Sequence, residues 1–299
     1  MQHGISTIAA AIALAAGLLP ATAPASTILE KIKSGKPLVI AHRDSSIPFS
    51  YVDKTSGKPV GYAVELCQLF GEALRKKAGV KSLQIQYVPV TSANRIEAIE
   101  QGTADLECGS TSNTADRRKR VSFVIPHFIT GARLLVRADA KMDVIEDFEN
   151  RKVVSTKGST PLKALQRLNT ERLLRLDILE APEHVKGVEM VEKGEADAFA
   201  MDDVLLFGLV AARPNPSAVR VTGKFLTTEA ISVMLAHDDA QAKKVLDDEM
   251  RRLLFSGEMY KLYDKWFTKP IPSVSVPLNM PMSYLLRAFW KFPTDFVPE

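Results

Sequence analysis

Short apolar runs that alternate with helical patterns constrain the fold of this chain more than any other feature. Residues 38–41 form a continuous apolar run, and residues 83–88 alternate between apolar and polar side chains. Between them, apolar side chains recur at helical spacing at Val64, Cys67, Phe70 and Leu74. Apolar strands that alternate with amphipathic helices are typical of α/β proteins with a mainly parallel sheet. The sequence therefore predicts an α/β fold.

A second unit of the same kind lies between two long extended segments, near residues 126–134 and 226–234. Its predicted strands cover residues 153–156, 176–179 and 196–201. The simplest geometry inserts this unit as a second lobe into the first, with two parallel crossing strands as a hinge and a ligand cleft between the lobes. The expected lobe 1 is residues 26–128 together with 231–299, and the expected lobe 2 is residues 129–230. Each lobe should be a mainly parallel sheet with flanking helices.

The N-terminal segment has the features of an export signal. The first 25 residues contain no Lys, Arg, Asp or Glu, and residues 8–19 form an apolar run that is too short to cross a bilayer. Small residues, Ala23-Pro24-Ala25, follow at the spacing of a cleavage site. We predict a signal peptide over residues 1–25, cleavage after Ala25 and a periplasmic mature chain. The alternative is a buried N-terminal helix.

The chain has only two cysteines, Cys67 and Cys108. An exported protein can carry a disulfide. Because Cys67 lies on the apolar face of a predicted helix and Cys108 in a predicted buried strand, two buried free thiols are an equally good interpretation. Neither cysteine has metal-ligand spacing.

Composition and motifs argue against several function classes. The net charge of +4 comes from 39 basic and 35 acidic residues that are mixed along the chain, so we expect no nucleic-acid partner. The sequence has no phosphate loop, no GxGxxG after a strand, no HExxH and no GxSxG. We therefore expect no cofactor, no bound metal and no catalysis.

One stretch has the layout of an anion-binding site. Residues 104–108 are typical of a short buried strand, which breaks at Gly109 and continues as a loop with Ser110 and Ser112. Arg117 follows one to two helical turns later. Hydroxyl groups, free backbone N–H groups at a helix start and an arginine suit a small carboxylate. The alternative is a hydroxyl-capped helix followed by a solvated basic run.

Five short motifs occur in order along nearly the whole chain. They are AHRDSSIPFSY at 41–51, TSANR at 91–95, ECGSTSN at 107–113, FAMDD at 199–203 and DKWF at 264–267. Together they resemble the periplasmic polar-amino-acid-binding proteins of ABC transporters, most closely the glutamate/aspartate-binding branch. The resemblance implies the two-lobed periplasmic-binding-protein fold and a monomer. It also implies a protein that captures L-glutamate or L-aspartate and delivers it to an inner-membrane ABC permease.

The resemblance assigns one group of residues to the backbone groups of the amino acid. Arg117 would hold the α-carboxylate as a bidentate fork, and Ser110, Ser112 and Thr160 would donate to it. Asp202 would take the α-ammonium group. Each has a simpler alternative: Thr160 before Pro161 is a good helix N-cap, and Asp202 could also be an N-cap.

A second group would surround the side-chain carboxylate of the ligand. Its members are Arg43, Ser92, Arg95 and His184. An acidic amino acid carries two carboxylates and one ammonium group, and a desolvated cleft must meet each with an opposite charge or donors. As alternatives, Arg43 could lie on the surface, Arg95 could pair with a nearby glutamate such as Glu100, and His184 could sit in the first turn of a helix.

Two other functions fit the same architecture. One is a periplasmic dehydratase that acts on prephenate or arogenate, which would need a general acid in a roomy cleft. The other is a ligand sensor without a transport role, which would use the same binding chemistry.

Overall fold

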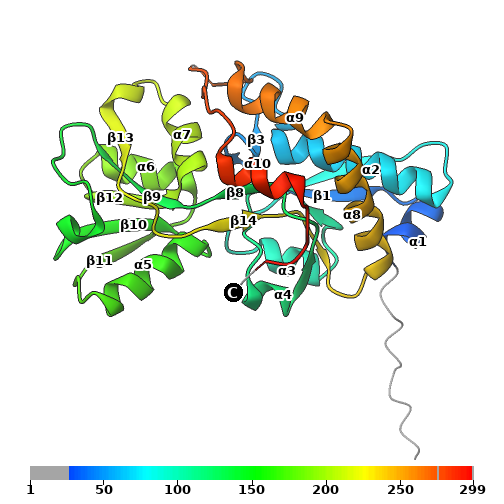
Figure 1. Ribbon diagram of the computed structural model, residues 1–299, viewed down its shortest axis with the longest axis horizontal. Helices are drawn as coiled ribbons and strands as arrows, with labels where there is room; N and C mark the ends of the chain where they lie inside the picture. Colours follow the sequence, from blue (N-terminus) through cyan, green and yellow to red (C-terminus); the bar gives the residue numbers. More distant parts are fainter. Residues whose placement is uncertain (1–26, 275, 298–299) are drawn as a thin grey trace, which may run out of the picture.

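The computed structural model describes residues 27–274 and 276–297, so the predicted signal peptide and its cleavage site lie outside the described residues. Two lobes lie side by side, and each is built on a five-stranded sheet flanked by helices (Figure 1). The predicted two-lobed α/β fold is confirmed. We call the half with the β1 sheet lobe 1 and the half with the β10 sheet lobe 2, and we propose boundaries at 128/129 and 230/231.

The sheet of lobe 1 has the order β5-β1-β6-β15-β7. Its strands are β1 (Leu38–His42), β5 (Ile85–Pro89), β6 (Leu106–Glu107), β7 (Val121–Phe123) and β15 (Met234–Ala236). Strand β1 pairs in parallel with β5 and β6, whereas β15 is antiparallel to both of its neighbours. A small sheet of β2 (Ser45–Ser46), β3 (Ser50–Val52) and β4 (Pro59–Val60) adjoins it in sequence.

The sheet of lobe 2 has the order β11-β10-β12-β9-β13. Its strands are β9 (Ala132–Arg137), β10 (Lys152–Thr156), β11 (Asp177–Ala181), β12 (Ala198–Asp202) and β13 (Val219–Thr222). Strand β10 is parallel to β11 and β12, and β9 is antiparallel to β12 and β13. Both lobes thus have three adjacent parallel strands, which point their carboxyl ends to one edge of the sheet.

Two crossing strands join the lobes, β8 (Phe128–Thr130) and β14 (Glu229–Ile231). They pair with each other in an antiparallel ladder, with Ala230 opposite Ile129. The prediction of two parallel crossing strands was wrong, because the chain enters lobe 2 through one strand and returns through the other. We call this pair the hinge strands.

Ten α-helices connect and cover the strands of the described residues. They are α1 (Ile28–Lys33), α2 (Tyr62–Ala78), α3 (Arg95–Glu100), α4 (Ala115–Arg118), α5 (Thr160–Glu171), α6 (His184–Glu192), α7 (Asp203–Ala211), α8 (Ala240–Phe255), α9 (Glu258–Tyr263) and α10 (Tyr284–Lys291). Short 3-10 turns lie at Ile145–Phe148 and Pro216–Ala218, and a π-turn at Asp264–Thr268. None of the described helices combines the length and apolarity needed to cross a bilayer.

The sequence did not predict α10, which lies within the proline-rich tail. The Ser283 hydroxyl caps its start by accepting from the backbone N–H of Leu286 at 3.1 Å. Its Leu286 and Trp290 side chains are buried, and Trp290 makes an edge contact with Tyr263. The helix lies over the hinge strand β8 (Figure 1). Only two of its eight side chains are buried, too few to mark a helix in a segment that begins with prolines.

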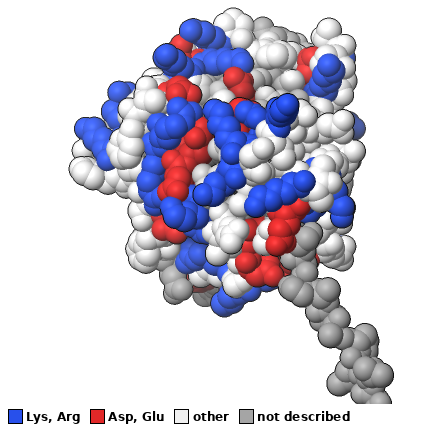
Figure 2. Space-filling model, turned by 90° about the vertical axis from the view of Figure 1, so that its right-hand side faces the viewer, with Lys and Arg blue, Asp and Glu red and all other residues white. Residues whose placement is uncertain are grey.

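Basic and acidic side chains alternate over the outer face of lobe 1, the face that Figure 2 shows. Helix α8 supplies pairs one helical turn apart, such as Lys244–Asp248 at 2.7 Å and Arg252–Glu249 at 2.7 Å. Such pairs leave the described part of this face without the uniform positive field that nucleic-acid binding requires.

The two cysteines form a disulfide that joins α2 to the loop after β6. The Cα atoms of Cys67 and Cys108 lie 6.3 Å apart, and both residues are fully buried. This settles the choice between a disulfide and two free thiols. The bond holds the loop that carries Ser110 and Ser112 against the core of lobe 1.

Removing this disulfide should destabilise the protein strongly. The bond closes a segment of 41 residues. The chain-entropy relation gives about 4 kcal/mol of stabilisation for a loop of that size. We expect the double variant Cys67→Ala/Cys108→Ala to lose about this much free energy of unfolding in urea titrations. A loss below about 1 kcal/mol would contradict a stapling role for the bond.

Candidate ligand-binding site

The predicted site residues follow the carboxyl ends of strands in both sheets. In lobe 1, Arg43 follows β1, Ser92 and Arg95 follow β5, and Ser110, Ser112 and Arg117 follow β6. In lobe 2, Thr160 follows β10, His184 follows β11 and Asp202 ends β12. Thr160 is half-buried and the other eight are buried. The parallel strands bring residues that are far apart in sequence to one edge, as the sequence pattern predicts.

Contacts between the lobes pass through these residues. The Arg43 guanidinium donates through Nη2 to Glu183 Oε2 at 2.8 Å. The Arg117 guanidinium donates through Nη1 to the carbonyl of Ser112 at 2.8 Å and through Nη2 to the carbonyl of Gly158 at 3.1 Å. Since Glu183 and Gly158 belong to lobe 2, both arginines of lobe 1 reach across the interface. The two lobes therefore meet at the candidate site.

Three buried guanidinium groups give the lobe 1 side a positive charge. Burial lowers the pKa of Arg95 to about 9, and repulsion from Arg117 and Arg43 adds to this while Glu107 opposes it. Burial also lowers the pKa of Arg117, against the attraction of Glu229, Glu107 and Asp202. Both remain cations at neutral pH. These mutual effects show that the three arginines lie in one electrostatic cluster.

The lobe 2 side offers a neutral imidazole and a carboxyl group. Burial, then repulsion from Arg43 and Arg95, holds the pKa of His184 well below its usual value. Its Nδ1 lies 2.8 Å from the hydroxyl of Thr156. Burial, then the negative charges of Glu229 and Asp203, raises the pKa of Asp202 well above its usual value. Asp202 is thus a carboxyl group that a cation would ionise.

Several polar atoms at this junction are buried without a protein partner among the described residues. They are Nε and Nη1 of Arg43, Nε of Arg95, Oγ of Ser92, Nε2 of His184 and Oδ1 of Asp202. A buried polar group without a partner costs about 1–3 kcal/mol, so such groups are rare and call for an explanation. The guanidinium donors suit carboxylates and the aspartate oxygen suits a cation. An amino acid with an acidic side chain supplies both.

The structure corrects one predicted role of Thr160. The N-cap of α5 is Ser159, whose hydroxyl accepts from the backbone N–H of Leu162 at 3.2 Å, and Thr160 is the first helical residue. The helix begins one residue earlier than predicted, because proline is also compatible with the second position of the first turn. Similarly, Asp202 precedes α7 but makes no side-chain cap. The side chains of Thr160 and Asp202 are therefore not engaged as caps.

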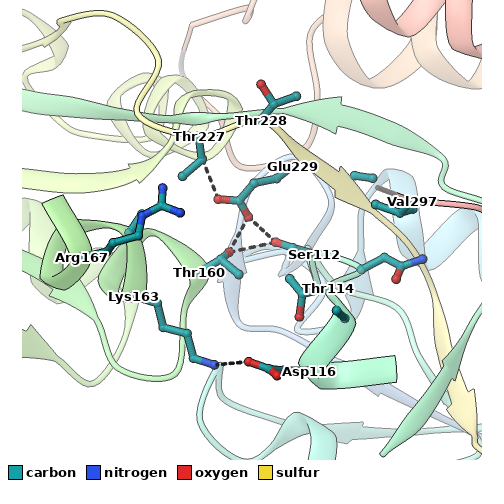
Figure 3. Close-up of a pocket in the computed structure, with 14 residues that line it drawn as sticks. Ser112, Thr114, Asp116, Thr160, Lys163, Arg167, Thr227, Thr228, Glu229 and Val297 are labelled. Atoms are coloured by element: carbon teal, nitrogen blue, oxygen red, sulfur yellow. Dashed lines mark hydrogen bonds and ion pairs between the residues drawn. The ribbon is translucent and has the colours of Figure 1, made fainter. Parts of the chain in front are cut away.

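The hydroxyl groups of Ser112 and Thr160 lie 2.9 Å apart across the lobe interface, and both donate to the Glu229 carboxylate (Figure 3). A hydroxyl has one proton, so a hydroxyl that donates to Glu229 offers only lone pairs to any other group. A cavity of about 520 Å³ opens beside this cluster. Of the nine predicted residues, only Ser112 and Thr160 line it.

Two carboxylates at the site were not predicted, Glu183 and Glu229. Glu183 carries no sequence signal beyond its place before His184, since acidic residues are common at helix starts. Glu229 does carry one, because a lone charged side chain in an otherwise apolar crossing segment is unusual.

The surface alternative for Arg43 is wrong, because its side chain is 0% exposed. The glutamate pairing for Arg95 is wrong as well. Its guanidinium donates to the carbonyl of Ser110 at 3.5 Å, while Glu100 pairs with Arg120. Ser110 also contacts Ser46, at 3.4 Å between their hydroxyl oxygens. Both arginines thus point away from solvent and into the junction between the lobes.

Residues 38–269 match the family of bacterial extracellular solute-binding proteins, family 3. The chain belongs to this family. It is 39% identical over 290 residues to the L-glutamate/L-aspartate-binding protein of Pseudomonas aeruginosa, with 96% of each chain covered. It is 38% identical over 293 residues to the glutamate/aspartate import solute-binding protein of Escherichia coli, with 97% of each chain covered.

Solved structures of other solute-binding proteins share the fold. An ancestral arginine-binding protein bound to arginine superposes with a TM-score of 0.69 at 21% identity, over 77% of this chain and 98% of that one. The cysteine-binding protein of Campylobacter jejuni gives a TM-score of 0.70 at 23% identity, over 81% and 93% of the two chains. At these identities the likeness concerns the fold of this solute-binding protein and not its ligand.

Close approach of the lobes should depend on Gly158. This residue has a φ of +76°, and a Cβ built on it would lie 2.7 Å from the carbonyl oxygen of Ser92 and from the Cα of Ala93. We expect Gly158→Ala to keep the lobes apart. Small-angle scattering should then give a larger minimum radius of gyration than for the wild type across a panel of amino acids. Binding should weaken by about tenfold or more, since overpacking costs about 1–3 kcal/mol.

Gly79→Ala is the matched control for this variant. Its φ is +73°, but a Cβ there meets nothing within 4 Å. It should lose about 1 kcal/mol of stability from the left-handed backbone and keep the compact form. Equal radii of gyration for the two variants would contradict the proposed interlobe role of Gly158.

Proposed function

We propose that this solute-binding protein captures L-glutamate or L-aspartate between its lobes in the periplasm and delivers it, as a monomer, to an inner-membrane ABC permease. One observation carries the ligand assignment: three buried guanidinium groups, from Arg43, Arg95 and Arg117, share a single junction with the carboxyl group of Asp202. The names of the relatives from Pseudomonas aeruginosa and Escherichia coli support the same ligands.

The charges of the site favour a ligand with two carboxylates. Buried cations are costly unless opposite charges and hydrogen bonds compensate them. In this proposal Arg117 holds the α-carboxylate with Ser110 as a further donor, and Asp202 holds the α-ammonium group. Because the Ser112 and Thr160 hydroxyls give their protons to Glu229, we assign their oxygens to accept from the ammonium group instead of donating to the carboxylate.

The remaining residues form the side-chain subsite. Arg43 and Arg95 offer unpartnered N–H groups, and Ser92 and His184 offer a hydroxyl and a ring nitrogen. A neutral His184 can donate one hydrogen bond through Nε2 when Nδ1 accepts from Thr156. Glutamate and aspartate differ by one methylene, a change worth about 1–3 kcal/mol in a tight pocket. Both therefore remain in the proposal.

Arg95→Ala should separate acidic from amide ligands. We would titrate the mature chain, residues 26–299, with L-glutamate, L-aspartate, L-glutamine and L-arginine by calorimetry after removing bound ligand by unfolding and refolding. The wild type should prefer an acidic ligand. Truncating one partner of a buried charge pair costs about 2–5 kcal/mol, so Arg95→Ala should lose at least about 30-fold in affinity for that ligand and much less for L-glutamine.

Arg120→Ala is the control for the charge change, because it removes one cation from an exposed pair with Glu100. Its affinities should match those of the wild type. Equal losses for acidic and amide ligands in Arg95→Ala would refute the role of Arg95. A wild type that prefers L-glutamine would refute the acidic-ligand assignment as a whole.

Ligand capture should release a proton from Asp202. Its pKa is raised in the protein, and an ammonium group bound to the carboxylate lowers that pKa again. Between the two pKa values the free protein holds a proton that the complex lacks, so affinity rises with pH through this window and levels off above it. Calorimetry in phosphate and in Tris at one acidic pH should give different heats, since the buffers take up the proton differently.

Asp202→Asn should abolish this buffer difference together with most of the affinity. Asp203→Asn is the neighbouring control, because Asp203 accepts from the Thr130 hydroxyl at 2.7 Å. Identical heats in both buffers at every pH from 5 to 8 would contradict the role of Asp202.

We infer that the protein binds its ligand without catalysis. The relatives that match nearly the whole chain are named as binding proteins. A protonated Asp202 is the one feature that a dehydratase with a general acid would share. Turnover of prephenate or arogenate by the purified protein would overturn this inference, and uptake that is unchanged in a deletion strain would favour a sensor.

A further inference from the structure

Glu229 is a buried carboxylate in one of the two hinge strands. It is the first residue of β14, it is 7% exposed, and its neighbour Ala230 pairs with Ile129 of β8. Carboxylates are rarely buried unless other groups satisfy them. The place of Glu229 between the lobes therefore calls for a role that a solvent-facing residue could not fill.

Three hydroxyl groups converge on this carboxylate. Ser112 from lobe 1 and Thr160 from lobe 2 both donate to Oε2, and Thr227 donates to Oε1 at 2.8 Å (Figure 3). Hydrogen bonds to a charged acceptor are roughly twice as strong as those between neutral groups. One carboxylate thus connects a loop of lobe 1, the start of a helix of lobe 2 and the hinge.

The contacts to the two lobes differ in what holds them. Backbone hydrogen bonds tie the Ser112 loop to the hinge strand: Asn113 donates to Ala230 at 2.8 Å, and Ser232 donates to Thr111 at 3.0 Å. The Ser112 contact with Glu229 is therefore internal to lobe 1 and its hinge strand. Thr160 reaches Glu229 on helix α5, which moves with lobe 2. Only the Thr160 contact should break when the lobes separate.

We propose that Glu229 is the latch of the closed form, a positioning residue that keeps Thr160 and lobe 2 against lobe 1 and so sets the rate of ligand release. This proposal rests on the proposed function only for the choice of ligand. The exposed pair beside it, Lys163 with Asp116 at 3.8 Å, also spans the lobes, but a solvated pair of this kind contributes little (Figure 3).

A carboxylate fits this task better than an amide. Both lobes' hydroxyls donate to the same oxygen while the other oxygen accepts from Thr227, so both oxygens must be acceptors. In Glu229→Gln one oxygen is replaced by an NH₂ donor of the same size. The variant preserves the shape of the junction and removes either the link to Thr227 or the link between the lobes.

The test is a chase experiment with radiolabelled L-glutamate. Glu229→Gln should speed dissociation by about tenfold and leave association within about twofold, because losing a buried charged hydrogen bond acts on the dissociation rate. Thr160→Val removes the same link from the side of lobe 2 and should have a similar effect. The double variant should dissociate no faster than the stronger single variant, since both changes break one contact.

Thr228→Val is the matched control. Thr228 is next to Glu229 and lines the same cavity, with no hydrogen bond to the carboxylate among the described contacts. It should leave both rates unchanged. Wild-type dissociation in Glu229→Gln, or effects of Glu229→Gln and Thr160→Val that add in full, would overturn the latch. Urea titrations of each variant confirm that the protein being measured is folded.

A wild type that does not bind L-glutamate would refute the proposed function and leave the latch open to a separate measurement. Small-angle scattering without added ligand then decides it. The latch predicts a larger radius of gyration for Glu229→Gln and Thr160→Val than for Thr228→Val. Equal radii for all three variants would overturn it.

Discussion

The rest of the structure depends on the burial of like charges at one sheet edge. Arg43, Arg95 and Arg117 all belong to lobe 1, and their side chains are withdrawn from water. Buried charges must be paired, and most of the compensating carboxylates come from elsewhere. Glu183 and Asp202 come from lobe 2 and Glu229 from the hinge, while only Glu107 is local. Lobe 1 alone therefore cannot satisfy its own site, which makes lobe 2 and an anionic ligand complementary to it.

The same constraint explains why His184 is neutral. Two guanidinium groups lie near its ring, and a third positive charge in the same dry volume would be strongly unfavourable. The Thr156 hydroxyl at 2.8 Å fixes the ring from the side of lobe 2. A neutral imidazole can still donate one hydrogen bond, so it recognises a carboxylate without adding charge. Specificity for the ligand then comes from the arginines, and His184 refines its position.

The sequence was enough to predict the lobes and the location of the site, because both follow from local pattern. An apolar run that ends in polar residues marks a strand and its carboxyl end, and parallel strands collect those ends at one edge. What could not be predicted depends on long-range geometry. The direction of the hinge strands, the disulfide, and the Arg43–Glu183 pair each join segments that no local pattern connects.

Hydroxyl residues show this limit most clearly. Their type predicts a hydrogen bond, but the direction of the proton depends on the neighbour, and Glu229 decides it for Ser112 and Thr160. The helix cap shows the same limit, since Ser159 and Thr160 are both good caps and only the tertiary structure selects the first.

A carrier that closes around its ligand must not close equally well without it. A ligand shifts the balance between open and closed forms only by its difference in affinity for the two. Contacts that the lobes make by themselves favour closure in either case, so they must be few. Here the main ones, Arg43 with Glu183 and Arg117 with the carbonyl of Gly158, involve the arginines that a ligand also needs. Each arginine divides its N–H groups between lobe 2 and the site, so closure is strongest when a carboxylate occupies the remaining donors.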